Sequence, residues 1–162
     1  MKSVRYALVF GAIVALAACS HKATVMTSEG PASVSQSDDG KSMTVTTKDG
    51  TVSIDKAVDA STLGAPVYPG ATSAGSLSGT TEKGTGALAT YTTKDSFDKV
   101  YAFYKSKLPA GSEKMKMATG DSQMAVFQVG ADSAPEQTSV TVNAENGETT
   151  IQIAHGTKTQ GN

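Results

Sequence analysis

Short segments in the second half of the chain alternate apolar and polar residues with a period of two, which predicts β-strands. In residues 114–119 the two methionines fall on one side and the lysines on the other. Residues 137–144 and 148–155 alternate in the same way, whereas residues 123–129 are apolar on both sides. We therefore expect four consecutive strands, of which the second is central.

One helix is predicted just before these strands. Asp95 is a suitable N-cap, and the Pro-Ala-Gly sequence at 109–111 ends the helical pattern. Five apolar residues have the spacing of a single helical face: Phe97, Val100, Tyr101, Tyr104 and Leu108. Residues 87–93 form a further strand ahead of this helix.

A hairpin is predicted earlier in the chain, because Asp49-Gly50 lies between the alternating segments 42–47 and 51–55. The expected order is therefore β-α-β-β-β-β with a preceding hairpin. Short turns make neighbouring strands antiparallel, and one helix can cover only one sheet face. The predicted fold class is α+β, with an antiparallel sheet of four to six strands packed on one amphipathic helix.

The first 18 residues have the features of an export signal. Lys2 and Arg5 are followed by an almost entirely apolar run over residues 6–18. A basic start, a short apolar core and small residues at its end are typical of a secretory signal peptide. The run is shorter than the roughly 20 residues of a membrane-spanning helix.

Cys19 is the only cysteine, and it ends the sequence Leu16-Ala17-Ala18-Cys19. This sequence resembles the lipobox of bacterial lipoproteins. The resemblance implies cleavage before Cys19 and acylation of its thiol and amine by chains such as palmitate. Ser20, where an aspartate marks retention in the inner membrane, implies the outer membrane, facing the periplasm of a two-membrane bacterium. The alternative is an incidental cysteine beside an ordinary cleavage site.

The rest of the chain divides into three predicted parts. Residues 19–40 contain few apolar positions, so we expect a lipidated cysteine followed by a flexible tether. Residues 41–156 form a single domain, and residues 157–162 form a polar tail. Within the domain, Ala-Pro-Val-Tyr-Pro-Gly-Ala at 65–71 and the helix segment 95–104 resemble a group of uncharacterised exported bacterial proteins with a Tyr-Pro-Gly-Ala motif. That resemblance implies a compact domain and no known catalytic residues.

Charge excludes one class of partner. The chain has 14 Lys and Arg residues against 15 Asp and Glu residues, and two of the basic residues belong to the signal. The exported part is therefore mildly acidic, whereas a nucleic-acid-binding protein usually carries a basic face. We expect no nucleic-acid partner.

Three methionines are candidates for a metal site. Met115, Met117 and Met124 could bind copper(I), because thioether sulfur suits a soft metal ion. Methionines that alternate along a strand also fill hydrophobic cores, and this is the competing interpretation.

The other candidate positions have structural explanations. His21 and His155 have no metal-spaced partner nearby, and no Gly-x-Ser-x-Gly sequence is present. We therefore expect no enzyme and no cofactor. Phe103 lies off the apolar helix face and is a candidate for a docking surface, with lateral packing as the alternative.

These observations predict a lipid-anchored cell-envelope protein whose domain binds an envelope protein or a small ligand on its sheet. The membrane is contacted through the N-terminal lipid, and no feature sets the oligomeric state. A periplasmic copper-handling protein is the alternative function.

Overall fold

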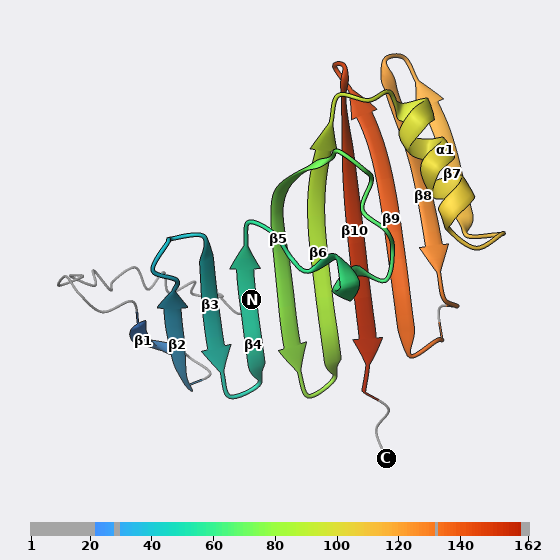
Figure 1. Ribbon diagram of the computed structural model, residues 1–162. Helices are drawn as coiled ribbons and strands as arrows, with labels where there is room; N and C mark the ends of the chain where they lie inside the picture. The colour runs from blue at the N-terminus through green and yellow to red at the C-terminus, as the bar shows by residue number, and fades with distance from the viewer. Residues whose placement is uncertain (1–21, 28–29, 132, 160–162) are drawn as a thin grey trace, which may run out of the picture.

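The computed structural model describes residues 22–27, 30–131 and 133–159. Their strands form one ten-stranded sheet in which every neighbouring pair is antiparallel (Figure 1). The spatial order is β1-β2-β3-β4-β5-β6-β10-β9-β8-β7. The strands are β1 Lys22–Thr27, β2 Gly30–Gln36, β3 Ser42–Thr47, β4 Gly50–Asp55, β5 Thr72–Thr81, β6 Gly84–Thr93, β7 Glu113–Thr119, β8 Ser122–Val129, β9 Glu136–Glu145 and β10 Glu148–Lys158. No helix in the described part of the chain is long and apolar enough to cross a membrane.

The predicted α+β class with a four- to six-stranded sheet is wrong. The fold is mostly β, with strand at 60% and helix at 11% of the described residues. Strands β1 and β2 lie in 19–40, where the sequence predicts a flexible tether, and β10 continues into the predicted polar tail. These segments form strands because each pairs along its length with a neighbour, which outweighs their weak apolar pattern.

Three hairpins of the sheet repeat one turn. The sequence Thr-x-x-Gly joins β1 to β2, β3 to β4 and β5 to β6. In each turn the threonine hydroxyl donates a hydrogen bond to the glycine carbonyl, at 2.8 Å in the first and 3.3 Å in the other two. The glycines have φ values of 123°, 156° and 144°, which L side chains rarely adopt. The first six strands are therefore successive copies of one hairpin design.

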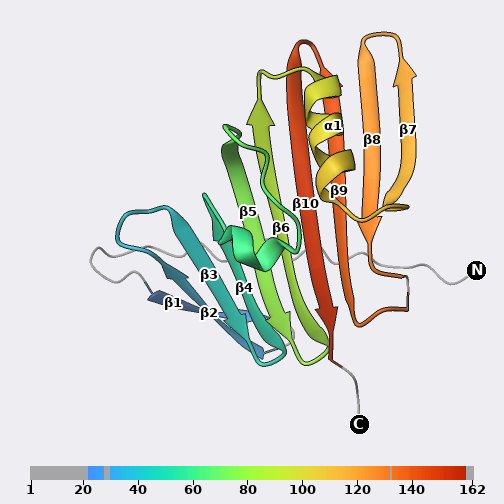
Figure 2. The ribbon, with the colours of Figure 1, turned by 45° about the vertical axis from the view of Figure 1, so that its right-hand side comes forward.

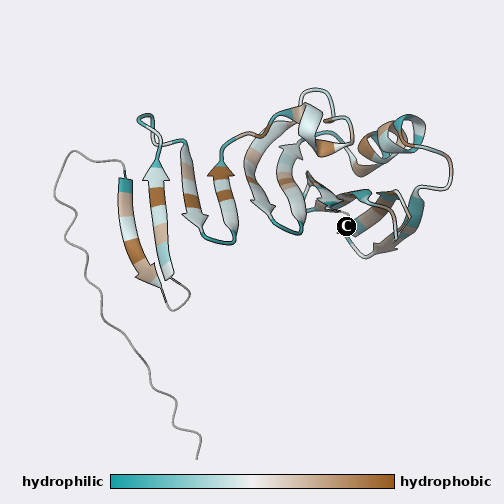
Figure 3. Ribbon diagram, turned by 90° about the horizontal axis from the view of Figure 1, so that it is seen from below, coloured by the Kyte–Doolittle hydropathy of each residue, from teal (hydrophilic) through white to brown (hydrophobic). Residues whose placement is uncertain are grey.

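One face of the C-terminal part of the sheet is covered. Helix α1 (Phe97–Lys107) lies over β8 and β9, and the 3-10 helix η1 (Ala60–Leu63) lies over β6 and β10 (Figures 1 and 2). The sheet contributes these residues to the core: Ala89, Tyr91, Ala125, Phe127, Val140, Val142, Ile151 and Ile153. The core therefore uses four of the ten strands. Figure 3, viewed from below, shows the helix and the η1 loop on one side of the sheet, away from the N-terminal strands.

The helix position agrees with the sequence prediction, but its N-cap is Ser96 rather than Asp95. The carboxylate of Asp95 instead accepts a hydrogen bond from the Tyr68 hydroxyl at 2.8 Å and forms an ion pair with Lys99 at 3.1 Å. Tyr68, and then Lys99, hold the pKa of Asp95 below its usual range. Asp95 therefore ties the Tyr-Pro-Gly-Ala segment to the start of the helix.

Candidate functional site

The apolar side of the sheet reverses between its two halves. In β9 and β10 the large apolar residues face the helix, whereas β6 and β8 carry large apolar residues on both sides. In β2–β5 they face the side opposite the helix, because the strand pairing aligns Met43 with Ile54, and Ile54 with Leu77. We call this surface the open apolar face. It consists of Val25, Val34, Met43, Val45, Val52, Ile54, Leu77 and Leu88.

The open apolar face is exposed to solvent. Ile54 is 48% exposed and Val52 is 42% exposed, and no described segment packs over them. Among the described residues, every exposed large hydrophobic residue except Met26 is on this side of the sheet. Large contiguous apolar patches of this kind mark sites of interaction. The exposed residues therefore form one surface and are not scattered, which makes this face a candidate binding surface.

No described strand position on this side of β1–β6 carries a charge. The positions that share the open apolar face carry only small, apolar, threonine and glutamine side chains. The opposite side of β2–β5 is rich in serine and threonine, and Thr44 and Ser53 bond to each other there at 3.0 Å. Each of these strands therefore has a hydroxyl side and an apolar side, and the apolar side is the one left uncovered.

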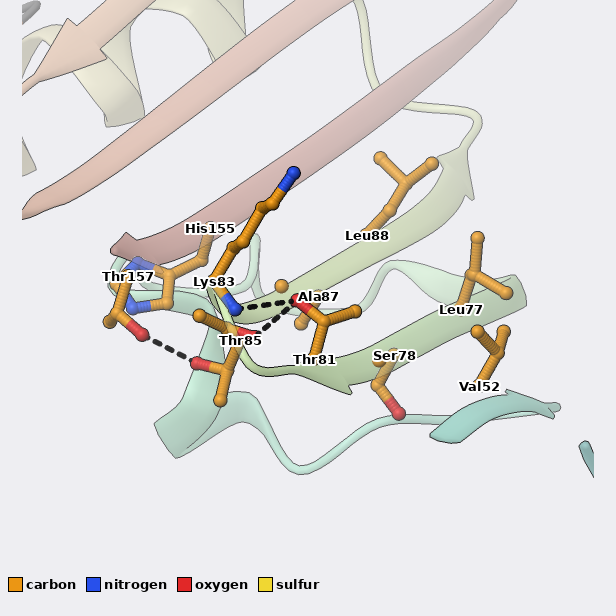
Figure 4. Close-up of a pocket in the computed structure, with 13 residues that line it drawn as sticks. Val52, Leu77, Ser78, Thr81, Lys83, Thr85, Ala87, Leu88, His155 and Thr157 are labelled. Atoms are coloured by element: carbon orange, nitrogen blue, oxygen red, sulfur yellow. Dashed lines mark hydrogen bonds between the residues drawn. The ribbon is translucent and has the colours of Figure 1, made fainter. Parts of the chain in front are cut away.

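A hollow of about 490 Å³ interrupts the open apolar face (Figure 4). Val52, Leu77, Leu88 and Lys83 of the β5–β6 turn line it, while Ser78 points to the other side of the sheet. Pairing places Gly79 beside Gly86, and Gly86 beside Gly156, so three adjacent strands have no side chain along one row. The floor of the hollow is therefore bare backbone.

At two of these positions, neither the φ value nor a steric clash requires glycine. Gly86 and Gly156 have no left-handed φ value. A Cβ atom would meet a carbonyl oxygen at 3.8 Å on Gly86 and at 3.7 Å on Gly156, which is ordinary contact. Gly79 is tighter, with a carbonyl oxygen at 3.3 Å. Glycine within a strand often marks the close approach of a ligand or of another backbone.

The three candidate methionines lie together on the same side of the sheet. Pairing sets Met117 beside Met124, and Met115 beside Val126. Met115 is 42% exposed and Met117 is 48% exposed, so these two do not fill the core as the competing interpretation supposed. Met117 and Met124 line a second hollow with Glu145 and Glu148.

Lys116 of β7 points the other way, as the alternation predicts. The Lys116 ammonium lies 3.8 Å from the centre of the Tyr101 ring on the helix side. Nearby, Lys105 forms an ion pair with Glu113 at 3.2 Å, and Lys105 and the Tyr101 hydroxyl lower the pKa of Glu113. Charges on β7 therefore gather on the side opposite the methionines.

Phe103 is half-buried. Its ring makes edge contacts with Tyr68 at 5.2 Å and with Tyr104 at 5.1 Å between centroids. This packing joins the helix to the Tyr-Pro-Gly-Ala segment and occupies most of the ring. Cys19 and the signal residues Leu16, Ala17 and Ala18 lie outside the described residues.

His155 has the one arrangement in the described part of the chain that resembles a catalytic group. Its Nδ1 atom is 2.8 Å from the Thr138 hydroxyl, and its Nε2 atom is 3.4 Å from Glu136. Thr138 is only 4% exposed, and a Cβ atom on Gly64 would lie 2.3 Å from its hydroxyl oxygen. The Thr138 and His155 side chains pack against Gly64, which follows η1, and both also line a hollow of about 330 Å³. No cluster of three His, Cys, Asp or Glu residues suited to a metal ion occurs in the described ranges.

No protein-family model matches this chain, and neither a curated protein nor a solved structure matches it. Its function is therefore inferred from the arrangement of its own residues.

Sequence reasoning expected binding on the sheet but did not identify the residues of the open apolar face. The available signal was the Thr-x-x-Gly turn, which occurs at Thr27, Thr47 and Thr81. Aligning the three turns places Val25, Val45 and Gly79 two residues before each threonine. The same alignment places Ala32, Val52 and Gly86 two residues after each glycine. The repeat reveals both the apolar row and the point at which glycine replaces it.

Proposed function

We propose that this protein is a lipid-anchored component of the bacterial cell envelope that acts by binding rather than by catalysis. The open apolar face is its binding surface. The observation that carries the proposal is the concentration of exposed large hydrophobic residues on one side of six adjacent strands. Burying each such side chain fully contributes about 1.5–3 kcal/mol, so a partner that covers several of them can bind firmly.

The N-terminal lipid would place this surface close to a membrane. Strand β1 begins at Lys22, three residues after Cys19, and three residues span at most about 11 Å. Acyl chains on Cys19 would therefore hold the edge of the sheet near the bilayer instead of on a long tether. Two or more acyl chains anchor stably, whereas one alone binds only marginally. The proposed location is the outer membrane, facing the periplasm.

Replacing Cys19 by alanine is expected to abolish lipidation without unfolding the sheet, since the buried core cluster is built from residues between Leu63 and Ile153. Cells labelled with radioactive palmitate should incorporate the label into the wild-type protein and not into Cys19→Ala. The variant should also leave the membrane fraction. Ser20→Ala is the matched control and should be labelled normally. Palmitate in the Cys19→Ala protein would contradict the lipoprotein assignment.

Binding through the open apolar face is tested with a charge on that face. Ile54→Asp is expected to abolish specific crosslinked adducts of the full-length protein in membranes, because a buried unpaired carboxylate is costly. Thr46→Asp is the control, since Thr46 is exposed on the neighbouring strand but on the hydroxyl side. Adducts should survive in the control. An identical adduct pattern in both variants would exclude this face as the binding surface.

Copper handling is the second candidate, favoured by the pairing of Met117 with Met124 in one hollow. Anaerobic titration of the full-length protein with copper(I) is expected to shift the methyl resonances of Met117 and Met124. Met26 is exposed on the other side of the sheet and serves as the internal control. Shifts of equal size at Met26, or no shift at Met117, would exclude this function.

A further inference from the structure

A ridge and a hollow follow each other along one row of the open apolar face. Strand pairing aligns Val34 with Val45 and Val45 with Val52, which form the ridge on β2, β3 and β4. The same row continues through Val52 to Gly79, and then to Gly86 and Gly156, on β5, β6 and β10. Three strands with valine are thus followed by three strands with no side chain.

From this pattern we infer that the occupant of the open apolar face is a second copy of this chain, packed face to face. The inference rests on the proposed binding function and specifies its partner. A two-fold axis that lies between the two sheets, parallel to the strands at the β4–β5 boundary, sets the ridge of each copy over the hollow of the other. Val52 then faces the partner subunit's Gly79, and Val45 faces the partner subunit's Gly86.

The same two-fold axis also brings the neighbouring row of apolar residues of the two copies into contact. Ile54 on β4 faces the partner subunit's Leu77, and Met43 on β3 faces the partner subunit's Leu88. In this row large apolar residues meet one another, while in the first row valine enters a glycine hollow. A two-fold interface requires one surface to complement itself, and this face does so in both rows.

Size also favours a second copy. The strand positions on this side of β2–β6 carry no charge, and the charges near the contact are Lys83 in the turn between β5 and β6, which lines the hollow, and Lys158 beside Gly84 at the end of β10. The axis brings six strands of each copy into contact, β2–β6 and β10. At about 4.8 Å apart and about six residues long, they cover roughly 580 Å² on each copy. The two copies together would bury about 1,200 Å², which exceeds the roughly 1,000 Å² expected of a biological interface.

The hollow distinguishes a second copy from a lipid surface. A fluid bilayer adapts to any apolar face and does not need bare backbone at fixed positions. Gly86 lines the hollow and is not required by its own backbone, so a rigid group that enters the hollow would explain why it has no side chain. The valine ridge on the same face has the matching strand spacing.

Crosslinking in intact membranes tests the inference. The sole native thiol is Cys19, which acylation would block, so Val52→Cys introduces a unique free thiol in the full-length protein. A short bismaleimide should link two copies of Val52→Cys, because the two-fold axis brings this residue near its own counterpart. Thr46→Cys, on the hydroxyl side, should give no homodimer. Adding Gly86→Val to Val52→Cys fills the hollow and should reduce the crosslinked dimer at least about tenfold through overpacking.

A Val52→Cys dimer that is lost on adding Gly86→Val supports a second copy packed face to face, provided that Gly86→Val keeps the circular dichroism of the wild type. A dimer that Gly86→Val leaves unchanged overturns the ridge-in-hollow packing. Adducts to a different protein that depend on Ile54 overturn the second copy as occupant but keep the proposed function. Protection of the thiol in Val52→Cys without any protein adduct points to lipid and overturns the inference. Failure of the proposed function itself would appear as no adduct and no protection.

Discussion

Phe127→Ala is expected to lower the free energy of unfolding by about 3–5 kcal/mol, the range for removing a large aromatic side chain from a core. Phe127 is 1% exposed on β8. Its ring lies 5.8 Å from that of Tyr101 and 6.2 Å from that of Tyr104, which links the sheet to the helix. The truncation would leave a cavity at this junction. Urea unfolding of the wild type and the variant, followed by circular dichroism, measures the change.

Val126→Ala is the matched control for this prediction. Val126 precedes Phe127 on the same strand, so its side chain points to the other side of the sheet, where it is half-buried. Neither described helix covers that side, so Val126→Ala is expected to lower the free energy of unfolding by less than about 1.5 kcal/mol. An equal decrease in the free energy of unfolding of the two variants would contradict the assignment of the covered face.

The elements with strong apolar periodicity could be predicted from the sequence. The 11-residue helix α1 falls within the apolar pattern that begins at Phe97, and its face of Phe97, Val100 and Tyr104 is buried. Strands β9 and β10 bury Val140 and Ile151 as their alternation indicates. In these segments the residues that make the periodic pattern are the same ones that the core buries, so the local sequence pattern and the tertiary packing favour the same structure.

The N-terminal strands could not be predicted in this way. Strand β5 contains one large apolar residue, Leu77, among serine, threonine, glycine and alanine. Its strand conformation comes from pairing with β4 on one side and β6 on the other. Strands β1 and β2 likewise take their strand conformation from pairing with each other and, for β2, with β3. Pairing between segments is a property of the assembled sheet, which an isolated polar segment does not reveal.

The open apolar face could be predicted from the sequence only in part, for a related reason. Alternation shows that Met43 and Val45 share one side of their strand, but it does not show which side of the sheet is covered. That depends on pairing register, since a shift by one residue exchanges the two sides. On β6, Leu88 lies on the open apolar face while Ala89 and Tyr91 enter the core. The apolar side changes at this strand, and only the assembled sheet shows the change.

Gly84→Ala is expected to lower the free energy of unfolding by about 3 kcal/mol or more, because two separate effects act at this position. Gly84 has a φ of 144°, a conformation that residues with a Cβ atom avoid. A Cβ atom would also lie 1.9 Å from the Thr157 carbonyl oxygen, a backbone atom that cannot rotate away. The substitution should separate β6 from β10 at this end, where the N-terminal strands join the C-terminal core. Urea unfolding measures the loss, and hydrogen exchange locates it.

Gly86→Ala is the matched control, two residues further along β6 and on the same side of the sheet. Its φ is ordinary, and the nearest atom to a Cβ would be a carbonyl oxygen at 3.8 Å. Because alanine also restricts the unfolded chain more than glycine does, Gly86→Ala should be neutral or stabilising by up to about 1 kcal/mol. A large loss of stability in Gly86→Ala would mean that the sheet itself needs this glycine. In that case the hollow in the open apolar face would be a by-product of strand pairing, and the ridge-in-hollow packing of two copies would lose its main support.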